Sequence, residues 1–136
     1  MLENKKDYIE IGVAIIRREN LVLVGKRPQN KLFGGKWEFP GGKIEPSESP
    51  ENCIVREIKE ELDIKIGNLE PLSVLEHEYP GGKRFRLHFY FCEIAEGEPR
   101  ALWHDEILWI EAGKLAEIDS LFADIGLIPL VQEKIV

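Results

Sequence analysis

The sequence predicts a single mixed α/β (α+β) domain that spans residues 1–136. Apolar runs rich in β-branched residues recur along the chain, and one amphipathic segment with helix signals at its start lies between them. Size agrees with this, because 136 residues with 43% hydrophobic side chains suffice for the core of one ordinary domain. We find no internal repeat, low-complexity tract or linker that would divide the chain.

Strands are expected where apolar and β-branched residues cluster between turn signals. The first two, at 8–17 and 21–24, are separated by the polar pair Glu19-Asn20, which predicts a tight hairpin. A loop rich in Gly, Pro and Lys follows, interrupted by a short strand near 37–39. Further strands are expected at 72–79, 84–94 and 107–110, the first two of them joined by the Pro-Gly-Gly-Lys turn at 80–83.

A helix is expected at 50–62. Ser49 suits the N-cap, Pro50 the first helical position, and Glu51 the first turn, where the helix dipole favours an acid. The expected core-facing stripe consists of Ile54, Val55, Ile58 and Leu62. An amphipathic stretch at 112–118 and a last helix at 127–135 complete the expected elements.

Composition excludes several classes of protein. The formal net charge of −7 argues against nonspecific binding of nucleic acid, and no apolar run approaches the roughly 20 residues of a membrane helix. The charged N-terminus lacks the apolar region of a signal peptide, and two cysteines do not form a disulfide framework or a zinc site, so we expect a cytoplasmic protein. The three histidines do not lie at metal-ligand spacing and are expected to be structural.

Three carboxylates share one face of the expected helix. Glu57, Glu60 and Glu61 lie within about 100° of one another at 3.6 residues per turn. Such a run is commonly a solvated surface, but like charges three and four residues apart repel unless a cation lies among them. Carboxylate oxygens are also what Mg²⁺ prefers when it binds a substrate's phosphates as well. Composition alone leaves the solvated face and the metal site as even alternatives.

The residues around these carboxylates resemble the Nudix box, G-x5-E-x7-R-E-U-x-E-E-x-G-U, where U is a bulky aliphatic residue. The segment from Gly42 to Ile64 matches every position of this pattern except one, where Asp63 replaces the usual glycine at the helix end. The stretch GGKWEFPGGKIE is most similar to the MutT-type nucleoside triphosphate pyrophosphohydrolases of that superfamily. The resemblance covers nearly the whole chain and implies an α/β/α sandwich with a mixed, curved sheet between helices.

The resemblance implies a chemistry and a set of roles. Glu57, Glu60, Glu61 and the carbonyl of Gly41 would bind Mg²⁺, with Mn²⁺ as a possible substitute, and a nucleoside triphosphate would be cleaved to the monophosphate and pyrophosphate. Glu57 is the first candidate for activating the attacking water. Glu48 is the second, although an ion pair between Glu48 and Arg56 that braces the loop is an equal alternative. Arg56 is expected to orient Glu57.

Three residues outside the box are expected to contact the substrate. Arg27 matches the place of a substrate-contacting arginine in MutT-type proteins, with an exposed strand-end charge as the alternative. Phe39 is a candidate for the nucleobase pocket, with simple core packing as the alternative. Asp124 stands where MutT uses an asparagine to read the base.

One position departs from the resemblance. MutT-type proteins often have a further acid where this chain has Trp103, and Asp105 or Glu106 could take its place if the loop folds back. Alternatively, Trp103 packs over the rim of the pocket or stacks on a base.

The favoured substrate is an oxidised purine nucleotide such as 8-oxo-dGTP, handled by a monomer or homodimer. CTP or another pyrimidine triphosphate, a dinucleoside polyphosphate, ADP-ribose and the 5′ end of RNA remain alternatives. Lys26, Arg27, Lys31 and Lys36 could form a small basic rim for the RNA end. A nucleotide-binding Nudix module without activity is the alternative from another class.

Overall fold

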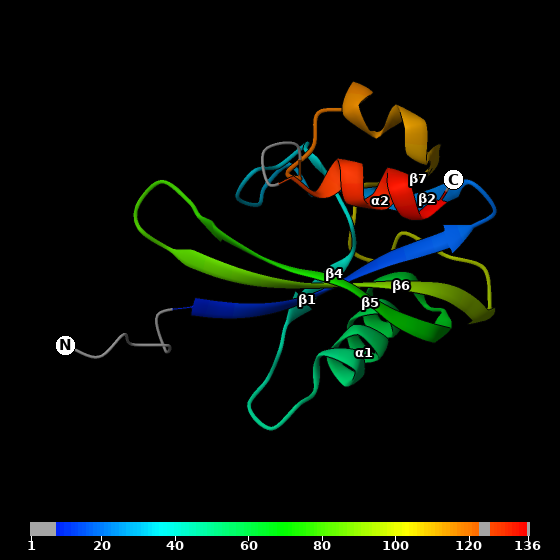
Figure 1. Cartoon of the computed structure of the whole chain (residues 1–136), viewed down its shortest axis with the longest axis horizontal. Coiled ribbons are helices and arrows are strands. Elements are labelled where there is room, and N and C mark those ends of the chain that lie inside the picture. The colour runs from blue at the N-terminus through cyan, green and yellow to red at the C-terminus, as the bar shows by residue number, and fades with distance from the viewer. Residues whose placement is uncertain (1–7, 123–125, 136) are drawn as a thin grey trace.

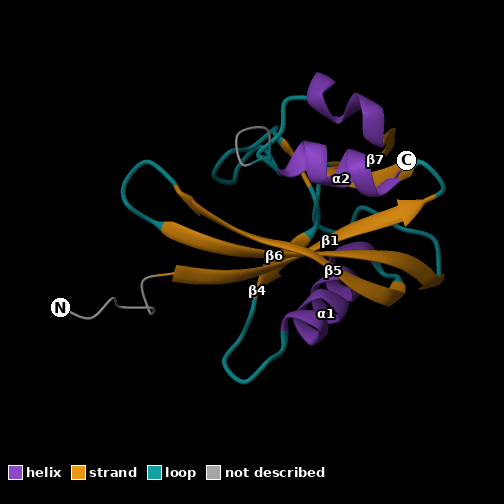
Figure 2. Ribbon diagram, viewed as in Figure 1, coloured by secondary structure: helices purple, strands orange, loops and turns teal. Residues whose placement is uncertain are grey.

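The computed structural model describes residues 8–122 and 126–135. A mixed β-sheet lies between helix α1 (Pro50–Leu62) on one side and helix α2 (Leu127–Ile135) with the 3₁₀ helix η2 (Ala112–Glu117) on the other (Figure 1). Figure 2 shows the same arrangement by secondary structure, with the helices on opposite sides of the strands. The predicted mixed α/β fold with a sheet between helices is confirmed.

Seven strands make up the sheet. They are β1 (Tyr8–Arg18), β2 (Leu21–Lys26), β3 (Trp37–Glu38), β4 (Gly41–Lys43), β5 (Lys65–Glu78), β6 (Arg84–Glu96) and β7 (Glu106–Glu111). The order is β3-β2-β1-β6-β5, with β4 paired to β1 and β7 paired to β2. Only the pairing of β1 with β6 is parallel among these described strands, so the sheet is mixed.

Strand β1 connects the two parts of the sheet. Its first nine residues pair with β6, while Ile11 to Val13 also pair with β4 on the other edge. Its last two residues, Arg17 and Arg18, continue into the predicted hairpin with β2. The two glycines of β4 are therefore held against the middle of β1, directly before the loop that leads to α1 (Figure 1).

Helix α1 begins and ends where the sequence predicts. The Ser49 hydroxyl accepts a hydrogen bond from the Asn52 amide at 3.1 Å, and Pro50 occupies the first turn. Asp63 adopts the left-handed conformation, with φ 56° and ψ 41°, and its amide donates to the Lys59 carbonyl. An aspartate thus closes the helix in the backbone conformation that glycine adopts more readily.

One member of the expected stripe of α1 is wrong. Ile54, Ile58 and Leu62 are fully buried, but Val55 is 37% exposed and Cys53 is buried in its place. The reason lies in β1, because a side chain at Gly12 would meet the Cys53 sulfur at 3.2 Å. Because Gly12 has no side chain, the Cys53 sulfur has room to pack against β1.

Two differences from the predicted strands concern turn residues. Strand β4 lies within the Gly-rich segment that was expected to be loop around the short strand at 37–39, and the strand expected at 72–79 begins at Lys65. Shifts of register between β5 and β6 near Gly67 and Pro71 accommodate residues that ordinarily interrupt a ladder. Asn68, at φ 54°, lies within the first of these irregularities.

Two apolar layers hold the helices to the sheet. The layer beneath α1 contains Ile16, Leu23, Ile54, Ile58 and Cys92, among others, and the layer beneath α2 contains Val13, Ile15, Phe89, Phe91 and Leu127. Both cysteines are free and buried, and burial raises the pKa of Cys53 to about 11 and of Cys92 to about 12. Neither thiol is therefore a ready nucleophile. No helix in the described part of the chain is long and apolar enough to cross a membrane.

Candidate active site

A cavity of about 640 Å³ opens between the sheet and the loop that precedes β3. Glu38, Glu61 and the backbone of Gly41 and Gly42 line it, and we call these residues its polar end. Aromatic side chains supply much of the remaining lining, among them Phe33, Phe39, Tyr79, Phe85 and Phe122. The cavity can therefore hold a ligand with a flat apolar part and a polar or charged part.

The glycines of β4 allow the polar end to form. A side chain on Gly41 would collide with the Gly12 carbonyl of β1, and a side chain on Gly42 would collide with the carboxylate of Glu57. Two residues without side chains thus let α1 bring its carboxylates against the backbone of β4. The match between Gly42 and Glu57 explains why the predicted motif requires a glycine at that distance from the acids.

Glu61 is the carboxylate of α1 that lines the cavity. Its Oε1 is buried and has no hydrogen-bond partner among the described residues. Burial of the side chain raises the pKa of Glu61 to about 9, and the neighbouring carboxylates of Glu57 and Glu38 act in the same direction. A hydrogen bond from the Gly41 backbone lowers the pKa of Glu61, so Gly41 lies beside the same carboxylate. A buried carboxylate with an unused oxygen beside other acids is a site that a cation would stabilise.

Arg56 joins the loop to the carboxylate face of α1. Its Nε donates to Glu48 Oε2 at 2.8 Å and its Nη2 to Glu48 Oε1 at 2.9 Å, while Nη1 donates to Glu57 Oε1 at 2.8 Å. The same Nη1 lies 3.6 Å from the exposed Glu60. The hydrogen bonds from Arg56 lower the pKa of Glu48 to about 2, and those carboxylates raise the pKa of the guanidinium. The expected ion pair between Glu48 and Arg56 is present, and Arg56 also holds Glu57.

The four expected metal ligands are neighbours, but they do not form a finished coordination site. Glu61 and Gly41 line the cavity, Glu57 lies between Gly42 and Arg56, and Glu60 lies at the exposed side. Among the described residues, no three His, Cys, Asp or Glu side chains are gathered closely enough to hold an ion as they stand. The donor set nevertheless fits a hard divalent cation, since it consists of carboxylates and a backbone carbonyl, one of them with an unpartnered oxygen.

Aromatic rings in contact with one another form much of the apolar lining. Phe39, 6% exposed, stacks on Phe122 with ring centroids 4.7 Å apart, so it is both a core residue and a wall of the cavity. In a second group, Phe33 lies against Tyr79 at 5.5 Å, and Tyr79 meets Phe85 edge-to-face at 5.1 Å. Burial raises the pKa of Tyr79. Aromatic walls of this kind bind flat heterocyclic rings.

Arg27 and Trp103 lie together at the wall of the cavity. The Arg27 guanidinium lies over the Trp103 ring, 5.5 Å from its centroid, and both residues line the cavity. Trp103 is 36% exposed, as expected for a residue at the rim. Asp105, one of the two acids that could replace a carboxylate at this position, instead accepts a hydrogen bond from the Gln29 amide, and neither it nor Glu106 lines the cavity. Asp124, the expected base-reading residue, lies outside the described residues.

Two residues at the polar end are absent from the sequence-based set. Glu38 Oε1 accepts from Arg27 Nη1 at 3.0 Å, and Glu38 Oε2 lies 3.0 Å from His104 Nε2. His104 was expected to be structural; it is buried, does not itself line the cavity, and directly contacts the cavity residue Glu38. The available signal was an acid between Trp37 and Phe39 in a short strand, since a charged side chain in an aromatic setting needs partners.

Comparison with known proteins gives a consistent result. The family model of the NUDIX domain matches residues 8–129. An 8-oxo-dGTP diphosphatase of Escherichia coli is 40% identical over 92 residues, which is 67% of this chain and 70% of that protein. A CTP pyrophosphohydrolase of the same organism is 33% identical over 120 residues, 88% of each chain. The crystal structure of a MutT NUDIX hydrolase from Burkholderia pseudomallei superposes with a TM-score of 0.76 at 26% identity, over 94% of this chain and 98% of that one.

Proposed function

This chain belongs to the NUDIX domain family, and from that membership we propose that it is a divalent-metal-dependent pyrophosphohydrolase that cleaves a nucleoside triphosphate to the monophosphate and pyrophosphate. One observation carries the proposal most directly. Glu61, with a buried and unpartnered oxygen, lines a cavity that aromatic rings also line. A nucleotide fits such a cavity, because its flat base can lie against the aromatic rings. Its phosphates can lie near Glu61 if a cation bridges them to the acidic side chains.

The α1 carboxylates and the Gly41 carbonyl would hold the cation, with Mg²⁺ as the expected ion and Mn²⁺ as a substitute. A bound divalent ion would neutralise the triphosphate and supply a water of lowered pKa. Glu61 would ionise when the ion arrives, because a positive charge offsets the burial that keeps it protonated. Glu60, exposed at the edge of the face, would be the ligand nearest to solvent.

Glu57 is the proposed general base. Its carboxylate accepts from Arg56 Nη1 at 2.8 Å, lies against Gly42 and has Glu61 as a hydrogen-bonding neighbour, so its orientation is fixed. It would accept a proton from the water that attacks the β-phosphorus. Glu48 is the weaker candidate for this role, because both of its oxygens are occupied by Arg56. We assign Glu48 and Arg56 to orienting Glu57.

The base would lie against Phe39 and the other aromatic residues that line the cavity. Arg27 would approach the phosphates or the sugar from the wall, and Asp124 remains the proposed residue for reading the base edge. We favour 8-oxo-dGTP as substrate, given the 40% identity to an 8-oxo-dGTP diphosphatase. CTP is the second candidate, because the CTP pyrophosphohydrolase aligns with a larger share of this chain. Two free, buried cysteines suit the reducing cytoplasm in which we expect the protein to act.

A nucleotide panel tests this proposal. Purified protein with Mg²⁺ would be given 8-oxo-dGTP, dGTP, CTP, diadenosine tetraphosphate and ADP-ribose. Pyrophosphate, inorganic phosphate and the nucleotide products would be measured separately, because hydrolysis of the last two compounds releases neither pyrophosphate nor inorganic phosphate. We expect pyrophosphate as the main product and the highest kcat/KM with one of the triphosphates. Inorganic phosphate as the main product would refute the proposed reaction. Binding of nucleotides without hydrolysis of any compound would identify a binding module instead.

A further inference from the structure

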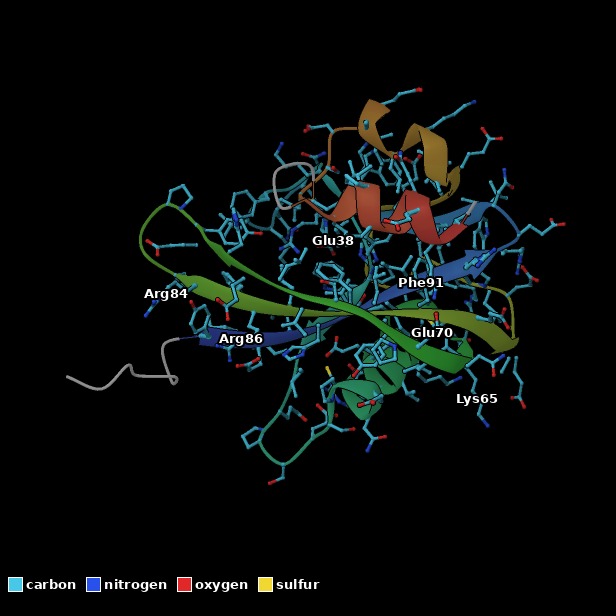
Figure 3. All side chains as sticks on the ribbon, viewed as in Figure 1. Glu38, Lys65, Glu70, Arg84, Arg86 and Phe91 are labelled. Atoms are coloured by element: carbon cyan, nitrogen blue, oxygen red, sulfur yellow. The ribbon has the colours of Figure 1, made fainter. Side chains whose placement is uncertain are left out.

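Glu38 lies at the junction of the polar end, the loop and β2. It belongs to β3, where it pairs with Gly25 of β2, and it lines the cavity on the side of the sheet that carries α2 (Figure 3). Its side chain is only 16% exposed, and each of its two oxygens has its own partner, Arg27 or His104. A carboxylate this enclosed, with both oxygens engaged, is suited to holding other groups in place.

His104 gives Glu38 a fixed position. Its side chain has no exposed surface, and its ring packs flat against Gly25, where an added side chain would lie 2.5 Å from ring atoms. Nδ1 is buried without a partner, so the tautomer that carries its hydrogen on Nε2 avoids a buried, unpaired donor and lets His104 donate to Glu38. The glycine in β2 thus makes room for a ring whose polar contact is with the cavity residue.

Arg27 connects Glu38 to the loop at 28–35. Its Nη1 donates to Glu38, its Nε donates to the Leu32 carbonyl at 2.8 Å, and its own carbonyl accepts from the Gly35 amide at 2.9 Å. Leu32 is 73% exposed yet lines the cavity beside Phe33, whose ring lies against Tyr79. The Gln29 backbone amide also donates to Asp105, so the hydrogen bonds of Arg27 are one of several contacts that hold this wall. Among the described residues, Nη2 of Arg27 makes no hydrogen bond and is left for a ligand.

We propose that Glu38 is a positioning residue for the substrate: held by His104, it fixes the Arg27 guanidinium and, through it, the 28–35 loop that walls the cavity. The predicted effect on KM rests on the proposed function. The predicted effect on the order of the loop does not, because it can be measured in a protein without activity. If Glu38 acts through Arg27 and the wall, it contributes mainly to substrate binding. The divalent ion would be bound by other carboxylates.

Three variants test the chain of contacts. Glu38→Gln keeps the size of the side chain but replaces one accepting oxygen with a donor, so it cannot accept from both Arg27 and His104. His104→Leu removes the donor, whereas His104→Gln retains an N–H group in about the place of Nε2. Asp119→Asn is the matched control, because it removes an exposed ion pair with Lys36 at the far end of the same loop.

We expect Glu38→Gln to raise KM about tenfold, the effect of losing one charge-assisted hydrogen bond, and to change kcat less than about threefold. Amide hydrogen exchange at Gly34 and Gly35 should become faster by a similar factor. His104→Leu should raise KM and speed amide exchange in the same way. His104→Gln should bring both quantities most of the way back to wild type, and Asp119→Asn should not change either. The affinity for Mn²⁺ without nucleotide, measured by electron paramagnetic resonance, should fall far less in Glu38→Gln than in Glu61→Gln, because Glu38 is a charge near the ion site and not one of its ligands.

Wild-type KM together with wild-type loop exchange in Glu38→Gln would overturn the proposal. A loss of Mn²⁺ affinity in Glu38→Gln as large as that in Glu61→Gln would also overturn it, because Glu38 would then be a ligand of the ion. If wild-type protein hydrolysed none of the nucleotides, the proposed function would fail, but the exchange of Gly34 and Gly35 would still decide whether Glu38 positions the loop. Circular dichroism on each variant separates these effects from loss of the fold.

Discussion

Glu61→Gln should make the metal-free protein more stable at neutral pH. Glu61 is buried with Oε1 unpartnered, and burial raises its pKa from 4.5 to about 9. Between these two values the folded protein binds a proton that the unfolded chain releases. Stability therefore falls as pH rises through this window, by about 1.4 kcal/mol per pH unit. Glutamine has a similar shape and carries no such proton.

The size of the effect follows from the distance between pH 7 and the ordinary pKa of 4.5, which is 2.5 units. At about 1.4 kcal/mol per unit, the protonated Glu61 costs the fold about 3 kcal/mol at pH 7, and Glu61→Gln should recover up to that amount. The difference should shrink toward pH 4.5. Urea unfolding followed by circular dichroism, from pH 5 to 8.5 in the presence of a chelator, measures it.

Divalent cations should reverse the order of stability, so that wild type becomes more stable than Glu61→Gln. Mg²⁺ or Mn²⁺ should stabilise the wild type in proportion to ion concentration over Kd and should stabilise Glu61→Gln much less. Glu60→Gln is the matched control in the chelated samples, since that side chain is exposed and the change should alter stability by less than about 1 kcal/mol. If wild type and Glu61→Gln lost stability in parallel across this pH range, the buried, protonated Glu61 would be refuted.

Three further predictions concern the same site. Glu57→Gln should lower kcat by at least about 10²-fold, the usual size of acid–base effects, with an unchanged circular dichroism spectrum; unaltered turnover would remove Glu57 from the base role. Glu48→Gln should make the free energy of unfolding depend less on pH in the acid range. The pKa of Glu48 is lowered to about 2, so its contribution to stability is present above pH 4.5 and is lost as pH falls toward 2. If the free energy of unfolding of the variant fell with decreasing pH as steeply as that of wild type, this prediction would be contradicted. Trp103→Glu should lower the Kd for Mn²⁺, measured by electron paramagnetic resonance, since it adds a carboxylate at the cavity rim. An unchanged Kd would mean that a carboxylate at position 103 does not reach the ion.

The features that the sequence predicted well are local ones. Helix α1 begins and ends as expected because Ser49, Pro50 and Asp63 act within one turn of the helix ends. The neighbourhood of Glu57 and Glu61 likewise follows from helical period. Such features depend on residues a few positions apart, so they can be predicted from the sequence alone.

The features that were missed depend on contacts between distant segments. Cys53 replaces Val55 in the core because Gly12, far away in the chain, leaves space for it. Glu38 and His104 are 66 positions apart, and only the pairing of β3 and β7 with β2 brings them together. No periodicity in the sequence records a contact of that kind.

Hydrolysis in ¹⁸O-labelled water tests the central claim most directly, namely that the carboxylate face of α1 serves attack of water on the β-phosphorus of a nucleoside triphosphate. The protein, Mg²⁺ and the best triphosphate of the panel would be incubated in labelled water, and both products would be analysed by mass spectrometry. The account predicts nucleoside monophosphate without label and pyrophosphate with one labelled oxygen, and no reaction above background with Glu57→Gln. Label in the monophosphate, or nucleoside diphosphate with labelled inorganic phosphate, would contradict it.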